Sequence, residues 1–347
     1  MSTGRAVTRA WVELLRVPAL FTVPGDSLAG AAATGLRPNH RTLLAIGSSL
    51  CLYEAGMALN DWADRAEDAV ERPERPLPSG RISAPAALAA ATVLTATGLA
   101  LASRAGRPSL AMAGALAGTV WAYDLGLKRT PAGPAAMAAA RGLDLLLGAT
   151  ATAGLGHGPS AKAAAPSAGA LAAHTLAVTV VSRREAQGGS SAAPLAALAA
   201  MTALAWWVGG GRWGNRGGPR GGRPGSPLGG ELRPRGGQTG GQSRFRLGLG
   251  PGGLRGGQNI GAALDTGRQA LRGAFALAYI GTTAKPLFHA ALNPSPPLTQ
   301  RAVGGGIRAM IPLQAALAAR AGAAGTALLT VALAPAARKF ARKVSVT

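Results

Sequence analysis

The sequence has very little cysteine and few acidic residues. Cys51 is the only cysteine among 347 residues, so no intramolecular disulfide and no cysteine-based zinc site can form. Asp and Glu total 14 against 36 Lys and Arg, and charged residues make up only 14% of the chain. A helical bundle in water needs a far more charged surface. The composition therefore disfavours a water-soluble bundle.

The chain contains many long apolar stretches. Hydrophobic residues make up 48% of the chain and the mean hydropathy is +0.20. A spanning helix needs about 20 mostly apolar residues, and many stretches come close while being rich in Ala and Gly, which permit close helix packing in lipid. We predict an all-α, polytopic transmembrane bundle of about nine spans. The predicted spans are 17–35, 42–59, 84–103, 109–127, 134–155, 167–182, 191–208, 270–285 and 306–335, the last long enough for two short helices around "ARAGAAG".

The net charge of +22 bears on membrane topology, because Lys and Arg collect in cytoplasmic loops. With the N-terminus inside, Asp61–Arg81, "LKRTPAGP" and "SRREAQGG" fall inside as well, although two intervening loops are also basic. No cleavable signal peptide is evident, so the first helix is expected to stay. We expect a multi-pass protein of a bacterial cell membrane, with these inner loops facing the cytoplasm.

Residues 209–267 differ from the rest in composition. The segment is rich in Gly, Pro and Arg without hydrophobic periodicity, which predicts a disordered insert between N-terminal helices (1–208) and C-terminal helices (268–347). Its RGG repeats are similar to nucleic-acid-binding segments, but only Trp213 and Phe245 are available to stack on bases. RNA binding, which predicts that deleting 209–267 removes the principal activity, is therefore the weaker hypothesis. A GC-rich coding stretch or a shifted reading frame also yields this composition.

The acidic residues gather after one apolar run. Asn60 and Asp61 follow Leu59, and Asp64 and Asp68 come at offsets of three and four, which would place three carboxylates on one helical face. Like charges so placed repel each other, and a divalent cation removes that penalty. A few oxygen ligands with room for water suit Mg²⁺ bound jointly with a phosphate group.

Arginines follow the acidic stretch at Arg72, Arg75 and Arg81. Their guanidinium groups are forks that match phosphate oxygens. Acids for a metal and arginines for phosphate together predict a diphosphate site. A solvated loop with internal salt bridges is the alternative.

Three segments carry a resemblance to a known family. Asn60-Asp61-x-x-Asp64-x-x-x-Asp68 followed by "RPLPSG" resembles the first signature of the UbiA-type intramembrane prenyltransferases, which are all-helical and usually have nine spans. "LLRVPALFTVPGDSLAG" is similar to the family's first helix, and "YDLGLKRTPAGP" to its segment after the fourth helix. The resemblance covers most of 10–208 and, more loosely, 268–347. It implies a metal site and a diphosphate site, with Mg²⁺ on Asn60, Asp61, Asp64 and Asp68 and the diphosphate on Arg72, Arg75, Lys128 and Arg129.

The family's second signature, Asp-x-x-x-Asp after the sixth helix, is degenerate in this chain. The corresponding segment is "VVSRREAQGGSSA", in which Glu185 is the only acid. It resembles a divergent bacterial subgroup with Ser-Arg-x-Glu and Gly-Gly there, often linked to secondary-metabolite pathways. The resemblance implies that Glu185 is a single catalytic metal ligand and that Arg183 replaces the charge of a missing cation. A site with one ion and another phosphorylated ligand, or with no catalysis, stays open.

The resemblance implies an integral-membrane, Mg²⁺-dependent prenyltransferase. A polyprenyl diphosphate would ionise at the acidic site while its tail lies in an apolar tunnel, and a small aromatic or secondary-metabolite acceptor would attack the cation. Asp61, Asp64, Asp68 and Glu185 would be the catalytic acids. The alternative is a non-catalytic component that binds or transports prenyl lipid or diphosphate, having kept the first signature and lost the second.

Polar residues inside the apolar runs are costly in lipid and therefore informative. Glu54 could point into the cavity beneath the acidic face. Arg141 and Asp144, three residues apart, are expected to pair with each other. His174 is expected to make a hydrogen-bonded helix–helix contact. Arg16 would either snorkel to the interface or recognise an acidic group of the acceptor.

Overall fold

The computed structural model describes residues 2–16, 20, 22–154, 156, 158–183, 190–210 and 254–344, with the backbone alone at 2–6, 158–159, 254–264 and 336–344. These residues form helices joined by turns and contain no strand, so the all-α prediction is confirmed. The helices are α1 (Ser2–Leu14), α2 (Val23–Ala33), α3 (His40–Ala63), α4 (Arg65–Glu71), α5 (Ala84–Ala105), α6 (Arg107–Leu125), η2 (a 3-10 turn, Leu127–Arg129), α7 (Gly133–Ala153), α8 (Gly158–Lys162), α9 (Ala165–Arg183), α10 (Ala192–Gly209), α11 (Leu254–Leu292), α12 (Pro296–Arg320) and α13 (Ala324–Val344).

The chain divides into two compact units, residues 1–211 with 268–347 and residues 212–267. Of the second unit the structure describes 254–267, which form the beginning of α11. This helix thus starts within the segment expected to be disordered. Extending a formed helix adds one hydrogen bond per residue at little entropic cost, and no proline follows until Pro286. The rest of the predicted insert, with its RGG repeats, lies outside the described residues.

Five helices of the described part are long and apolar enough to cross a membrane. They are His40–Ala63, Ala84–Ala105, Ser160–Arg183, Ala192–Gly209 and Pro296–Arg320. The total of about nine spans stays a prediction. Large apolar side chains on the outer helices α5 and α10 are exposed, including Val93 (64%) and Trp206 (54%). Lipid can solvate such side chains, whereas water would disfavour a continuous apolar exterior.

The last predicted stretch, 306–335, belongs to two helices. α12 ends at Arg320 and α13 begins at Ala324, and the break falls within "ARAGAAG". Gly322 there has φ +82°, a conformation that glycine adopts without steric cost. The two-helix alternative is therefore confirmed for this stretch.

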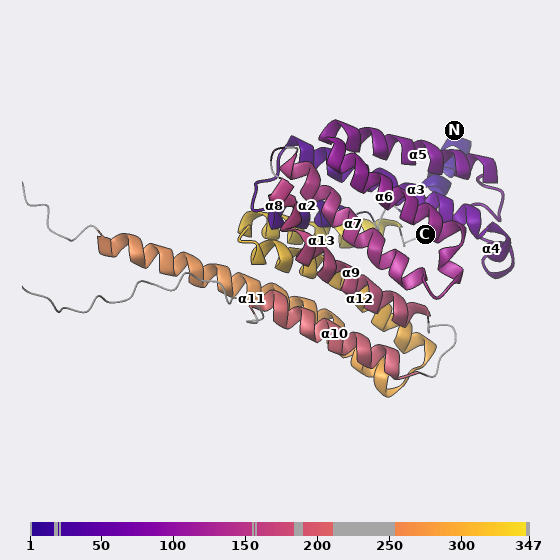
Figure 1. Cartoon of the computed structure of the whole chain (residues 1–347). Helices are drawn as coiled ribbons and strands as arrows, with labels where there is room; N and C mark the ends of the chain where they lie inside the picture. Colours follow the sequence, from indigo (N-terminus) through magenta and orange to yellow (C-terminus); the bar gives the residue numbers. More distant parts are fainter. Residues whose placement is uncertain are drawn as a thin grey trace, which may run out of the picture. The chain divides into compact units, whose positions relative to one another are not determined.

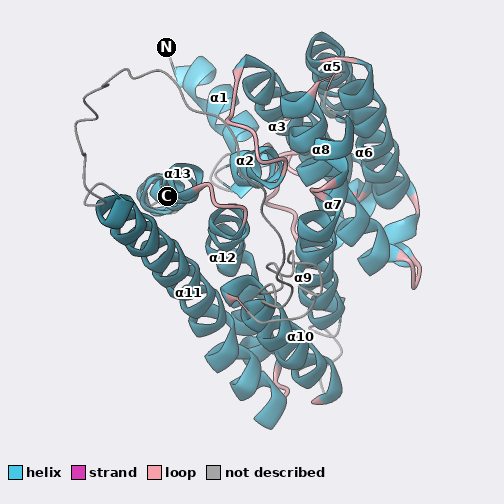
Figure 2. Ribbon diagram, turned by 60° about the vertical axis from the view of Figure 1, so that its left-hand side comes forward, coloured by secondary structure: helices cyan, strands magenta, loops and turns pink. Residues whose placement is uncertain are grey.

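Two helices organise the packing of the first unit. α3 packs against α5, α6, α2 and α7, and α12 packs against α2, α9, α10 and α13 (Figures 1 and 2). Small residues allow the close approach: a methyl group at Gly148 of α7 would overlap the backbone of Ser27 in α2. Hydrogen bonds and ion pairs bring three connections to one end of this bundle, namely the α3–α4–α5 connection, the α6–η2–α7 connection and the C-terminus of α9.

Candidate functional site

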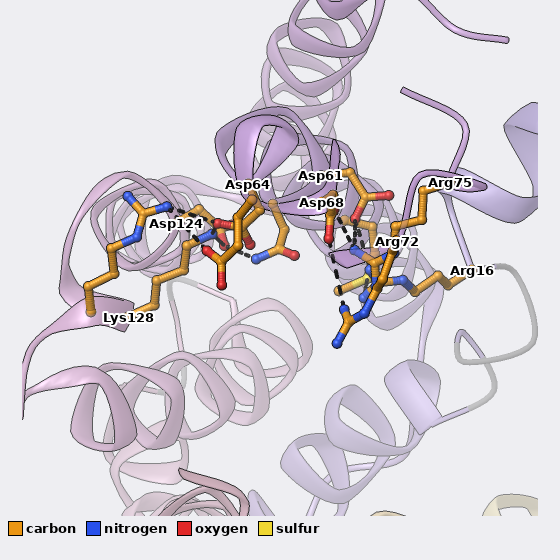
Figure 3. A network of polar contacts seen from close by, with 12 residues as sticks. Arg16, Asp61, Asp64, Asp68, Arg72, Arg75, Asp124 and Lys128 are labelled. Carbon is orange, nitrogen blue, oxygen red and sulfur yellow. Dashed lines mark hydrogen bonds and ion pairs between the residues drawn. The ribbon is translucent and has the colours of Figure 1, made fainter. Parts of the chain in front are cut away.

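The acidic stretch crosses a break between two helices. α3 ends at Ala63, and Asp64 has φ −92° and ψ 3° before α4 begins at Arg65. The prediction that Asp61, Asp64 and Asp68 share one helical face is therefore wrong, because that spacing argument assumes an uninterrupted helix. Asp61 and Asp68 lie together, while Asp64 points toward the end of α6 (Figure 3).

Asp61 and Asp68 contact three arginines, and we call these five residues the arginine group. Arg75 Nη1 lies 2.7 Å from Asp68 Oδ2 and 3.6 Å from Asp61 Oδ1. Arg16 Nη2 lies 2.8 Å from Asp61 Oδ1, and Arg72 Nη1 lies 3.9 Å from Asp68 Oδ1. Both acids are 4% exposed, whereas the side chain of Arg16 is 39% exposed and that of Arg72 is 52% exposed. Buried acids thus face cations that remain open to solvent.

The "RPLPSG" segment folds back to place Arg75 in this group. Ser79 N–H donates to Arg75 O and Ile82 N–H donates to Pro76 O, both at 3.0 Å. Arg81, expected to bind phosphate with its neighbours, instead donates to both carboxylate oxygens of Glu13, at 2.6 and 3.0 Å. These hydrogen bonds raise the pKa of Arg81 because they stabilise its charged form. Of Arg75 and Arg81, therefore, only Arg75 faces the buried acids.

Asp64 belongs to a second set of residues, which we call the lysine group: Asn60, Asp64, Asp124, Lys128 and Arg129. Figure 3 labels three of them, Asp64, Asp124 and Lys128. Lys128 Nζ lies 2.7 Å from Asp64 Oδ1 and 3.8 Å from Asp124 Oδ1. Arg129 Nη2 lies 3.2 Å from Asp64 Oδ1, and Asn60 Nδ2 donates to Asp124 Oδ1 at 2.9 Å. These contacts of two acids with two cations join the end of α3 and Asp64 to the connection between α6 and η2.

Residues 19–213, more than half of the chain, match the UbiA prenyltransferase family. The chain belongs to this family. Among curated UbiA relatives, a digeranylgeranylglyceryl phosphate synthase of Ignicoccus hospitalis is 36% identical over 146 residues, 42% of this chain and 48% of that protein. One of Methanothrix thermoacetophila is 34% identical over 152 residues, 43% and 55% respectively. The bacteriochlorophyll synthase 33 kDa chain of Cereibacter sphaeroides is 34% identical over 97 residues, 27% and 32%. The chain spans about half the length of the first two relatives.

Solved UbiA structures share the fold. One, described as "Structural and mechanistic insights into the biosynthesis of Digeranylgeranylglyceryl phosphate synthase in membranes", aligns with a TM-score of 0.56 and 15% identity over 91% of this chain and 98% of that chain. The apo structure of a UbiA homolog from Aeropyrum pernix K1 has a TM-score of 0.52 and 16% identity, covering 83% and 96%. The family and the apolar helices make this chain a membrane protein.

Sequence reasoning missed Asp124 of this UbiA site and the partner of Arg16. Arg16 was considered for snorkelling or for an acidic group of the acceptor, but it pairs with Asp61, 45 positions away, and no local pattern connects the two. Asp124 lies four residues before Lys128 in the "YDLGLKR" segment, a helical spacing that could have identified it.

The degenerate second signature lies partly outside the described residues, and Glu185 falls there. Arg183, at the end of α9, is described: its Nη1 donates to Thr130 O at 2.6 Å. Thr130 directly follows Arg129, so the end of α9 lies beside the turn that carries the two basic residues. The roles given to Glu185 and Arg183 stay predictions.

The site offers only small sets of oxygen ligands for Mg²⁺. Within the described ranges, no three His, Cys, Asp or Glu side chains gather into a metal site of their own. Mg²⁺ usually takes one or two protein carboxylates and completes its octahedron with water and substrate phosphate. Asp61 with Asp68, and Asp64 with the amide oxygen of Asn60, are sets of that size. These acids now pair with cations whose place as counter-ion Mg²⁺ would take. The donor set therefore fits the ion when a phosphate supplies the remaining ligands.

Away from the site, Arg141 has a different partner from the one expected. Its Nη1 forms an ion pair with Asp26 of α2, and Asp144 accepts a hydrogen bond from Ser49 of α3. The predicted Arg141–Asp144 pair is wrong, because α2 packs directly on α7 and brings a closer carboxylate. Gln314 of α12 also donates to Asp26, at 2.6 Å.

His174 makes the helix–helix contact that was expected. Its Nδ1 lies 2.9 Å from Tyr279 Oη of α11 and its Nε2 lies 3.1 Å from Gly306 O of α12. A carbonyl only accepts, so Nε2 carries the hydrogen and Nδ1 accepts from Tyr279. Glu54 is 8% exposed, and its Oε2 has no hydrogen-bond partner among the described residues.

Proposed function

We propose that this chain is a Mg²⁺-dependent intramembrane prenyltransferase that moves a prenyl group from a polyprenyl diphosphate to a small aromatic or secondary-metabolite acceptor. One observation carries the proposal: two neighbouring groups of buried or half-buried acids, each including at least one exposed or partly exposed cation, lie where apolar helices end. Membership of the UbiA family supports it, and the relatives named as digeranylgeranylglyceryl phosphate synthases favour a geranylgeranyl donor.

The arginine and lysine groups could bind metal and diphosphate by exchanging counter-ions. In this structure Arg75 and Lys128 neutralise the acids that would hold the metal, Asp61 and Asp68 on one side and Asp64 on the other. When bound, Mg²⁺ would supply positive charge to the departing diphosphate. With the acids bound to the ion, the Arg75 guanidinium and the Lys128 ammonium would be free to donate to diphosphate oxygens. Arg72, Arg129 and Arg183 are exposed beside them and extend the anion site.

The reaction then needs little movement from the protein. The allylic carbon–oxygen bond breaks, the diphosphate leaves with the electron pair, and positive charges already in place stabilise it. The nucleophilic atom of the acceptor bonds to the allylic carbon and loses its proton. Apolar side chains of the bundle hold the prenyl tail and keep water from the cation. We place the site at the cytoplasmic face, where the basic loops favour it.

The test is diphosphate release by the purified chain. The chain is incubated in detergent with labelled geranylgeranyl diphosphate, Mg²⁺ and a panel of phenolic acceptors. Release that depends on Mg²⁺ and falls sharply in Glu185→Gln supports the proposal. Glu71→Gln, which removes an exposed carboxylate from α4, is the matched control and should release at the wild-type rate.

A second candidate function is prenyl diphosphate capture without catalysis. It is favoured by the arginine group, in which three arginines outnumber two acids, so the group attracts a diphosphate even without metal. Capture predicts tight binding of geranylgeranyl diphosphate in EDTA and no release with any acceptor. That outcome would overturn the enzymatic proposal.

A further inference from the structure

Asp124 is the one acid of the site that lies outside the "NDWADRAED" stretch among the described residues. It is the penultimate residue of α6 and is 3% exposed. Its Oδ1 accepts from Asn60 Nδ2 at 2.9 Å and lies 3.8 Å from Lys128 Nζ. A buried acid therefore contacts two residues that the proposed function assigns to metal and diphosphate binding.

The second oxygen of Asp124 faces the packed side of the helix pair. A methyl group added at Gly56 of α3 would lie 4.0 Å from Asp124 Oδ2 and 3.0 Å from Val120 of α6. The carboxylate is thus held between α3 and α6, behind the amide of Asn60. This position suits a group that acts through Asn60 and Lys128 rather than one that touches the ligand.

Hydrogen-bond chemistry gives the contact a direction. An ionised carboxylate accepts and cannot donate, so the amide of Asn60 must turn its NH₂ toward Asp124. The amide oxygen then lies on the opposite side of the group, and it is the only atom of that side chain suited to a hard cation. Partners behind a metal ligand fix ligand orientation in this way in many metal sites.

We propose that Asp124 is a positioning residue: it orients the Asn60 amide oxygen toward the metal position and holds the Lys128 ammonium beside Asp64. The inference rests on the proposed function for the identity of the ligand.

Metal binding without turnover tests this role. Mn²⁺ titrations followed by electron paramagnetic resonance are run on the detergent-solubilised full chain, with the non-reactive analogue geranylgeranyl thiolodiphosphate present. Asp124→Leu keeps the size of the side chain and removes its acceptor oxygens, and should weaken Mn²⁺ binding about tenfold or more. Asp124→Asn can still accept from Asn60 through its amide oxygen, so it should lose less. Asp144→Asn alters a buried acid on α7 and should leave Mn²⁺ affinity unchanged.

A double-mutant cycle separates orientation from general damage. If Asp124 acts through Asn60, Asp124→Leu should have little further effect on Mn²⁺ affinity in an Asn60→Ala background. Additive losses, or wild-type Mn²⁺ affinity in a folded Asp124→Leu chain, would overturn the inference. If Asp124→Leu does not fold, the same cycle is run with Asp124→Ala, which also removes both acceptor oxygens.

The result also separates this inference from the proposed function. If the wild-type chain binds Mn²⁺ with the analogue but never releases diphosphate, the enzymatic proposal is contradicted, and the test of Asp124 by Mn²⁺ binding still applies. Unaltered binding by the Asp124 variants, with turnover intact, defeats only the positioning role. Absence of Mn²⁺ binding by the wild type defeats both.

Discussion

The site at the helix ends and a polar cluster inside the bundle use the same chemical groups but are packed differently. The arginine and lysine groups lie where helices end, and their cations include Arg72 and Arg129, with side chains 52% and 59% exposed. The internal cluster of Asp26, Arg141 and Gln314 joins α2, α7 and α12, and Asp26 and Gln314 are both fully buried. Exposed cations on turns can change partners when a ligand arrives. A cation held between packed helices cannot change partners. The arginine and lysine groups therefore suit ligand binding, and the internal cluster suits helix assembly.

The largest effect is expected from the internal cluster. Asp26→Leu leaves the Arg141 guanidinium buried without its carboxylate, and breaking such a pair costs about 3–5 kcal/mol. Unfolding in a series of detergent mixtures measures the loss. The double variant Asp26→Leu/Arg141→Met should regain most of the stability. A single variant as stable as the wild type would contradict a structural role for this pair.

Asp61→Asn should show the opposite behaviour. The variant removes the charge that faces Arg16 and Arg75, and we expect diphosphate release to fall on the order of 100-fold, since aligned charge carries much of such catalysis. Stability should change little because Asp61 lies among partly exposed cations that water can solvate. If Asp61→Asn strongly destabilises the chain but leaves turnover per folded molecule normal, Asp61 serves helix assembly rather than binding.

Gly25→Ala tests how tightly the internal cluster is packed. A methyl group there would overlap the side-chain amide of Gln314, and such overpacking costs about 1–3 kcal/mol. Gly114→Ala is the matched control: it lies within α6 with no atom near its new methyl group, so it should be neutral or slightly stabilising. Equal melting temperatures for the two variants would mean that α2 and α12 are free to separate.

The smallest effect is expected at Arg81. Its guanidinium is engaged with Glu13, in a half-exposed pair of the kind that contributes little. Arg81→Gln should change affinity for the thiolodiphosphate analogue less than about threefold, whereas Arg75→Gln should weaken it about tenfold or more because a charge-assisted contact is lost. Equal losses, measured by competition with labelled geranylgeranyl diphosphate, would place Arg81 in the anion site.

Local patterns in the sequence predicted much of the fold. Apolar runs of spanning length predicted an all-helical bundle, and the Gly-rich "ARAGAAG" predicted the separation of α12 from α13. The spacing of Asp61, Asp64 and Asp68 identified the right residues but the wrong arrangement. Residue spacing describes one regular helix, and the turn at Asp64 sends its carboxylate to the lysine group instead.

Residue types and their intervals along the chain thus determined the class of the molecule, its apolar spans and the family signature with its acids and arginines. Only the tertiary structure decided the partners: Arg16 with Asp61, Asn60 with Asp124, and Arg141 with Asp26. These pairs are 45, 64 and 115 positions apart. Charge attraction depends on distance in space, and helix packing sets that distance in a way that intervals along one chain do not encode.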